Sequence, residues 1–128
     1  MSGVVADTSV WIEFFAGRPA PGLDEALLHG LVVLPLVVVA ELVSGARRAA
    51  QRAAIARLVE ELPVYETPVD HWVRVGELRR TLLARGLSVS TPHAHVAQCT
   101  LDQSAVLFSR DGVFARIARV VPLKLQAG

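Results

Sequence analysis

The sequence contains a single cysteine, Cys99, which limits how the chain can be cross-linked. One cysteine cannot form a disulfide within the chain, so we expect a reducing compartment, the cytoplasm. Cys99 lies close to Val96 and Ala97, and we assign it to core packing. The first residues lack a basic region followed by an apolar stretch and a cleavage motif, so no signal peptide is predicted.

Long apolar runs are also missing. The most apolar segment, residues 31–40, has about half the length of a membrane-spanning helix, and Pro35 lies in its middle. We therefore expect no association with a membrane. A buried strand followed by the start of a helix is the predicted structure of this segment.

Charge of one sign is not in excess, because the formal net charge is +1. Any affinity for nucleic acid would therefore come from a local patch. Lys124 is the only lysine among 13 basic residues. Arginine binds phosphate through paired hydrogen bonds, although a general bias toward alanine and arginine explains the same count. Aromatic residues make up only 5%, too few for a base-stacking platform, so RNA would be recognised by its shape.

The chain has the length and apolar content of a single domain spanning residues 1–128, with 52% hydrophobic residues. Short apolar segments alternate with helical patterns along it. This alternation predicts an α/β fold with three α/β/α layers, in which helices cover both faces of a parallel sheet. The predicted strands are residues 4–6, 31–34, 64–65, 105–108 and 121–125.

The first predicted strand leads directly into a candidate site. Asp7 follows the strand, and Thr8 and Ser9 are good capping residues for a helix that begins near Val10. An acid at the carboxyl end of the first strand of an α/β protein points into the crevice where such folds bind ligands. The alternative is that Asp7 only caps the helix, and this stretch alone leaves both interpretations open.

Two further acids lack an ordinary explanation. Asp111 follows the predicted strand 105–108 as Asp7 follows the first, and Glu41 lies inside the most apolar predicted helix. If the strands before Asp7 and Asp111 are neighbours, the three carboxylates converge. Carboxylates about 4 Å apart repel by roughly 4 kcal/mol at an effective dielectric constant near 20, so a cation would be needed. Oxygen ligands favour Mg²⁺ or Mn²⁺, an arrangement that suits phosphodiester hydrolysis.

Four segments together resemble the PIN domain and, more narrowly, the VapC toxins of VapBC toxin–antitoxin pairs. They are residues 7–12, 40–42, 109–111 and 114–117. The resemblance implies a compact α/β/α fold with a mostly parallel five-stranded sheet. It further implies an endoribonuclease that depends on Mg²⁺ or Mn²⁺, forms a homodimer and is silenced by a VapB antitoxin.

The resemblance also assigns roles by position. Asp7, Glu41 and Asp111 become acidic metal-site residues. Thr8 or Ser9, and Ser109, become residues that support the site by hydrogen bonding. These seryl hydroxyls adjoin acids rather than bases, so a serine nucleophile is not predicted.

One position departs from the family pattern. The family frame Pro-Asp-Ala-His-Val-Ala is here residues 92–97, so His93 stands where the third acid is expected. A further acid common two residues after Asp111 is also absent, since Val113 occupies that place. Imidazole suits Mn²⁺ or Zn²⁺ better than Mg²⁺. Three explanations of His93 are open: a natural exchange of one ligand for another, the mark of a weakened or inactive member, or an introduced change. We expect reduced Mg²⁺ affinity and reduced cleavage.

The other histidines are assigned to structural positions. His93 and His95 are two residues apart, so on a helix their side chains point roughly 200° apart and cannot chelate one ion together. His95 is assigned to a helix face, and His29 and His71 to surface or capping positions. With one cysteine and no histidine pair at i,i+4 spacing, no structural zinc site is predicted.

The expected partners follow from the resemblance and from local charge. Arg47, Arg48 and Arg110 are candidates to bind RNA phosphates, although a solvated helix end, where arginine is favoured in any case, is the simpler explanation of the first two. The apolar helix that contains residues 10–15 offers part of a groove for an antitoxin helix. The competing hypotheses are a catalytically impaired module that binds antitoxin or RNA, and an ordinary α/β domain whose acids are caps facing different cavities.

Overall fold

A computed structural model describes residues 2–126 and contains a three-stranded parallel sheet in the order β2-β1-β3. The strands are β1 (Val4–Ala6), β2 (Val32–Val33) and β3 (Val106–Phe108). In the central strand, Val4 pairs with Val32 on one side and with Val106 on the other. The strands that precede Asp7 and Asp111 are therefore neighbours, as the convergence of these acids requires.

The predicted sheet of five strands is wrong in its count. Val64 and Leu125 each form only a single parallel bridge, to Leu34 and Leu107. A proline precedes the first predicted segment at position 63, and another lies within the second at position 122. Because proline has no N–H to donate, the hydrogen-bond ladder cannot extend through either position. The two predicted outer strands are thus reduced to bridge positions, while the parallel α/β class is confirmed.

Seven helices complete the part of the chain from residue 2 to residue 126. They are α1 (Thr8–Phe15), α2 (Pro21–Leu28), α3 (Leu36–Gly45), α4 (Ala49–Glu61), α5 (Val69–Ala84), α6 (Thr91–Asp102) and α7 (Val113–Ile117). Helix α1 begins two residues earlier than predicted because Asp7 itself is the N-cap, in place of Thr8 or Ser9. Ser90 caps α6, and its hydroxyl accepts a hydrogen bond from the backbone N–H of His93 at 3.3 Å.

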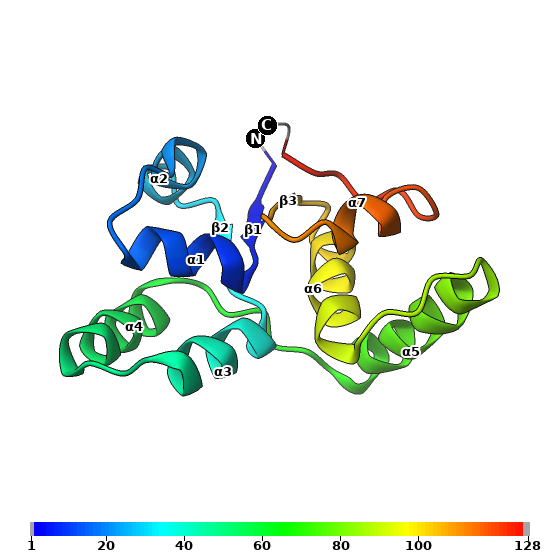
Figure 1. Cartoon of the computed structure of the whole chain (residues 1–128), viewed down its shortest axis with the longest axis horizontal. Coiled ribbons are helices and arrows are strands. Elements are labelled where there is room, and N and C mark those ends of the chain that lie inside the picture. The colour runs from blue at the N-terminus through cyan, green and yellow to red at the C-terminus, as the bar shows by residue number, and fades with distance from the viewer. Residues whose placement is uncertain (1, 127–128) are drawn as a thin grey trace.

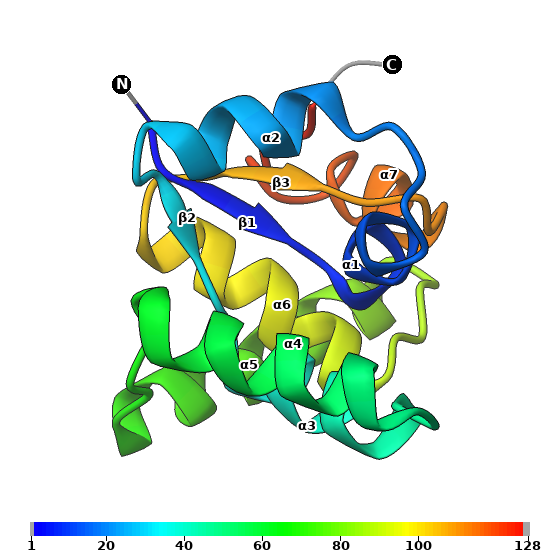
Figure 2. The same cartoon turned by 90° about the vertical axis from the view of Figure 1, so that its left-hand side faces the viewer.

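The helices form layers on the two sides of the sheet. Figure 1 shows α1 and α2 on one side and α6 on the other, with α5 packed on the outside of α6. In Figure 2 the three strands lie side by side, and α1 continues from the end of β1. No helix within the described residues is long and apolar enough to cross a membrane.

The core is centred on β1 and the elements that touch it. All of β1 is buried, and Trp11 and Phe114 are almost completely enclosed. Trp11 packs edge-on against Phe14 at a centroid distance of 5.5 Å. This apolar packing fixes the start of α1 against the sheet and thereby holds Asp7 at a defined place.

Candidate functional site

Asp7 is both a helix cap and the buried acid of a pocket. Only 6% of it is exposed. Its Oδ1 accepts hydrogen bonds from the backbone N–H of Val10 at 3.3 Å and from the Ser9 hydroxyl at 2.5 Å. Its Oδ2 accepts a hydrogen bond from the Ser109 hydroxyl, also at 2.5 Å. Helix capping explains the bond from the N–H of Val10. It does not explain the bond between Oδ2 and Ser109, which joins Asp7 to a segment 102 positions away.

The predicted acids line one common pocket at the carboxyl end of the sheet. Its lining residues are Asp7, Thr8, Ser9, Glu41, Pro92, His93, Val96, Asp111 and Phe114. Asp7 follows β1, Asp111 follows β3, and His93 lies in the first turn of α6. The hypothesis of unrelated caps requires the acids to face different cavities, and the shared pocket argues against it.

Glu41 reaches the pocket from α3, which packs against α1. Its Oε1 accepts a hydrogen bond of 2.6 Å from the Thr8 hydroxyl. The glutamate itself is exposed, so it avoids the large cost of burying an unpaired charge. Thr8 therefore fixes the direction of a carboxylate that solvent can still reach.

His93 is engaged at both ring nitrogens. Nδ1 lies 3.0 Å from the Ser90 hydroxyl oxygen, and Nε2 lies 2.9 Å from Oδ2 of Asp111. An ionised carboxylate only accepts, so Nε2–H donates to Asp111, and a neutral ring accepts from Ser90 at Nδ1. His93 therefore already forms a hydrogen bond with a carboxylate oxygen of Asp111, an acid of the same pocket. Both side chains are about two-fifths exposed, so water weakens this contact.

The loop after β3 is tied to α1 through its backbone. The N–H of Asp111 donates to the Ser109 hydroxyl at 2.9 Å, and its Oδ1 accepts from the N–H of Val113 at 3.0 Å. The N–H of Arg110 donates to the Ser9 hydroxyl at 3.0 Å. Ser9 and Ser109 each join Asp7 to this loop, so the relative positions of the two aspartates are fixed by hydroxyl bridges.

The chemistry of the donor set fits a hard divalent cation. Asp7, Glu41 and Asp111 offer oxygen ligands and no sulfur, which favours Mg²⁺ or Mn²⁺. Among the described residues, however, these three are not a group whose ligand atoms lie close together. An ion shared by all three would therefore be held partly through water. His93 adds a nitrogen that suits Mn²⁺ better than Mg²⁺.

The arginines predicted to contact RNA lie outside the pocket lining. The guanidinium of Arg110 pairs with Glu13, with 3.2 Å between Nε and Oε2. Arg47 and Arg48 are exposed in the turn between α3 and α4, and both of their backbone N–H groups donate to the Gln51 side chain at 3.2 Å. A role for these three residues in RNA binding stays a prediction.

The assignment of His71 to a surface or capping position is wrong. His71 is fully buried between α5 and α6, where its ring bonds to Asp102 and to His95. His95 is also fully buried, close to Cys99. A sequence signal existed, because His95 and Cys99 are four residues apart and so share one face of a helix. The signal is weak because the third member of the group, His71, comes from another helix and shows no spacing to the other two.

Comparison with known proteins decides the family. The sequence pattern of the PIN domain matches residues 4–120, nearly the whole chain. The chain belongs to the PIN domain family. The predicted resemblance is therefore confirmed. The fold of this PIN domain is similar to that of VapBC2 from Rickettsia felis bound to a promoter DNA fragment, with a TM-score of 0.77, 18% identity and 96% of both chains covered.

Two further solved structures have the same fold. VapBC-1 from nontypeable Haemophilus influenzae matches with a TM-score of 0.75 and 23% identity over 96% of both chains. VapBC-5 from Mycobacterium tuberculosis, a member of the VapBC family of toxin–antitoxin systems, matches with a TM-score of 0.73 and 25% identity over 100% of both chains. A comparison with curated proteins gave no match.

Proposed function

We propose that this PIN domain is a VapC-type toxin, a metal-dependent endoribonuclease whose Mg²⁺-supported cleavage is lowered by His93. The observation that carries the proposal is the single pocket shared by Asp7, Glu41 and Asp111, which come from three distant parts of the chain. Membership of the PIN family and the similarity to VapBC structures support the same conclusion.

The residues of the pocket have two roles. The acids would hold a metal ion, and the hydroxyl residues orient the acids. A bound Mg²⁺ or Mn²⁺ would supply an activated water and neutralise charge that develops on the phosphodiester. Asp7, Glu41 and Asp111 would hold that ion, directly or through water. Ser9 and Ser109 orient the Asp7 carboxylate, and Thr8 orients Glu41.

The hydroxyl groups are donors rather than nucleophiles in this scheme. Both seryl hydroxyls already donate to Asp7, and neither bonds to an imidazole base. The phosphodiester would therefore be hydrolysed by water, with the 3′ oxygen as leaving group. The bond between His93 and Asp111 competes with an ion for Oδ2 of that acid, which gives a physical reason for lowered activity with Mg²⁺.

The partners follow from the same assignment. The VapBC structures contain toxin and antitoxin together, and we infer a VapB-type antitoxin for this chain. An apolar pocket beside Glu41, lined in part by Ile12, Leu42 and Ile55, is a candidate place for it. Ile12 is 59% exposed, so it is available to a partner. RNA as substrate, a homodimer and a cytoplasmic location belong to this proposal as well.

Replacing His93 with aspartate tests the proposal directly. His93→Asp removes the competing hydrogen bond and adds the missing carboxylate, so we expect Mg²⁺-dependent RNA cleavage to rise by about 10-fold or more, the size of effect seen when metal ligation is retuned. The parent chain should cleave better with Mn²⁺ than with Mg²⁺. Mg²⁺ should also raise the melting temperature of the variant more than that of the parent, because the ion would offset the repulsion between the introduced carboxylate and Asp111.

The matched control is His29→Asp, which makes the same charge change at an exposed histidine far along the chain. It should leave cleavage unchanged. A folded His93→Asp protein with no gain in cleavage and no thermal response to Mg²⁺ would contradict the proposal. The second candidate function, a non-catalytic module that binds antitoxin or RNA, is favoured by the His93–Asp111 bond and predicts that neither ion supports cleavage by the parent chain.

A further inference from the structure

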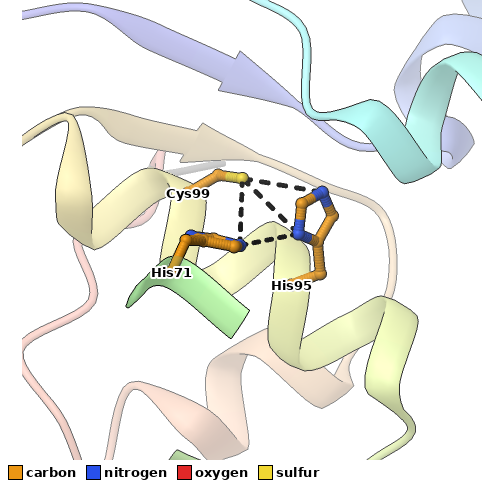
Figure 3. A group of neighbouring side chains, drawn as sticks. All are labelled: His71, His95 and Cys99. Atoms are coloured by element: carbon orange, nitrogen blue, oxygen red, sulfur yellow. Dashed lines mark hydrogen bonds between the residues drawn. The ribbon is translucent and has the colours of Figure 1, made fainter. Parts of the chain in front are cut away.

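A second group of ligand-type side chains lies between α5 and α6, away from the carboxylate pocket. It consists of His71 from α5 and His95 and Cys99 from α6, and all three are buried. Their ligand atoms lie within 4.8 Å of one another. Figure 3 shows the two imidazoles and the thiol pointing toward a common point. Among the described residues, this is the one group of three histidine, cysteine or acidic side chains whose ligand atoms lie this close together.

Asp102 decides which nitrogen of His71 faces the group. The Asp102 carboxylate accepts two hydrogen bonds from the Arg74 guanidinium and one each from Tyr65 and Gln98. A carboxylate surrounded by donors acts as an acceptor, so it accepts a bond of 2.8 Å from Nδ1–H of His71. In the neutral ring, Nε2 then carries a lone pair aimed at the group. A carboxylate behind a ligating histidine is a common arrangement at zinc sites.

The distances are close to those of a tetrahedral zinc site. Nε2 of His71 lies 2.8 Å from Nδ1 of His95, and Sγ of Cys99 lies 3.9 Å and 3.8 Å from these two nitrogens. Zinc bonds of about 2.0–2.1 Å to nitrogen and about 2.3 Å to sulfur place two nitrogens about 3.3 Å apart, and a nitrogen and a sulfur about 3.6 Å apart. Shifts of about half an ångström would fit these atoms around one ion.

The ligand types of the group also suit a divalent cation. The imidazoles of His71 and His95 would offer nitrogen lone pairs, and Cys99 would bind as the thiolate and release its proton when the ion enters. The thiolate would offset one of the two charges of Zn²⁺. The Asp102 carboxylate lies behind His71 and is shared with Arg74, at 2.8 Å.

We propose that His71 Nε2, His95 Nδ1 and Cys99 Sγ bind Zn²⁺ and thereby join α5 to α6. Two imidazoles and one thiolate are ligands that select zinc over Mg²⁺, so this site differs in kind from the pocket of oxygen ligands. His93 and His95 lie on different sides of α6, one at the pocket and one in the buried group. The ion would hold α6, which carries His93, against the helix outside it.

The single cysteine makes the test unambiguous. We would strip the full-length chain of metal with a chelator and titrate it with Co²⁺ while recording the absorption spectrum. A thiolate-to-cobalt charge-transfer band can arise only from Cys99, so we expect that band to saturate at one equivalent. Zn²⁺ should abolish the band by displacement, and Mg²⁺ should leave it unchanged. A folded chain that gives no thiolate band at saturating Co²⁺ would overturn the proposal.

Variants then locate the remaining ligands by Zn²⁺ calorimetry. Cys99→Ser keeps the volume of the side chain and should lose the cobalt band and most Zn²⁺ affinity. Asp102→Asn removes the carboxylate behind His71 and should weaken Zn²⁺ binding by about 10–100-fold. His29→Gln is the control for surface imidazoles, and His93→Asp is the control for the pocket; both should keep the band.

One result from the variants would assign the zinc to another place. Unchanged Zn²⁺ affinity in folded Cys99→Ser would exclude this group as the site. If Cys99→Ser does not fold, the cobalt spectrum of the unaltered chain still decides the matter. If saturating Co²⁺ gives no thiolate band, the group is a hydrogen-bonded core in which Nδ1–H of His95 donates to Nε2 of His71 without any ion.

Discussion

Replacing Asp7 with asparagine should reduce metal-dependent RNA cleavage by about 100-fold or more. Loss of one charged ligand removes several kcal/mol of electrostatic stabilisation from a metal-assisted reaction, and each 1.4 kcal/mol corresponds to about a tenfold change in rate. Asparagine retains Oδ1, which accepts from Val10 and Ser9, and it is as good an N-cap as aspartate. The fold should therefore survive while the charge is lost.

The measurement is the rate of cleavage with saturating Mn²⁺ and Mg²⁺, made in the parent chain and again in the His93→Asp background, where the signal should be larger. Ser109→Ala is a graded comparison, because it keeps the Asp7 charge and removes the hydroxyl that donates to Oδ2 of Asp7 and accepts from the N–H of Asp111, and it should cost about 10-fold. Melting temperatures within a few degrees of the parent would establish that folding is preserved. Full activity in folded Asp7→Asn would contradict a catalytic role for the pocket.

The features that were predictable from the sequence are those fixed by local pattern. The uncharged segment 4–6 forms a buried strand, and the hydroxyl-proline signal at Ser90 marks the start of α6. The neighbouring placement of β1 and β3 was a condition of the predicted convergence rather than a prediction, and their parallel pairing meets it. Convergence of Asp7 and Asp111 then follows from topology, since the carboxyl ends of parallel strands meet at one edge of the sheet.

The features that were missed depend on contacts between distant segments. Nothing in the local sequence around His71 indicates that Asp102, 31 residues away, supplies the acceptor that lets the imidazole be buried. The strand count failed for a different reason, because the prolines at positions 63 and 122 limit Val64 and Leu125 to single bridges. The position of the arginines relative to the pocket also depended on loop paths that periodicity does not specify.

The buried polar group around Asp102 is the second place where a large effect is expected, this time on stability. Arg74 donates two hydrogen bonds to Asp102, at 3.1 Å and 2.8 Å. Tyr65 and Gln98 each donate one at 2.9 Å, and His71 donates at 2.8 Å. Only 11% of the aspartate side chain is exposed. One carboxylate thus satisfies donors from α5, α6 and the segment that precedes α5.

Asp102→Ala should therefore lower the free energy of unfolding by about 3 kcal/mol, the cost of leaving buried partners without their counter-charge. For a domain of this size the melting temperature should fall by about 10 °C. The measurement is denaturant and thermal unfolding in the presence of a chelator, so that no metal contributes to the difference.

The control for this prediction is Gln98→Ala, which removes one neutral donor and leaves the Asp102 carboxylate in place. That change should cost about 1 kcal/mol. Arg74 is 41% exposed, so Arg74→Met should also cost less than loss of the aspartate, because water can replace part of the ion pair. Equal losses in all three variants would mean that Asp102 is one contact among several. A much larger loss in Asp102→Ala alone would mean that the buried His71 imidazole depends on this carboxylate, and that α5 is attached to α6 by a polar group rather than by apolar packing alone.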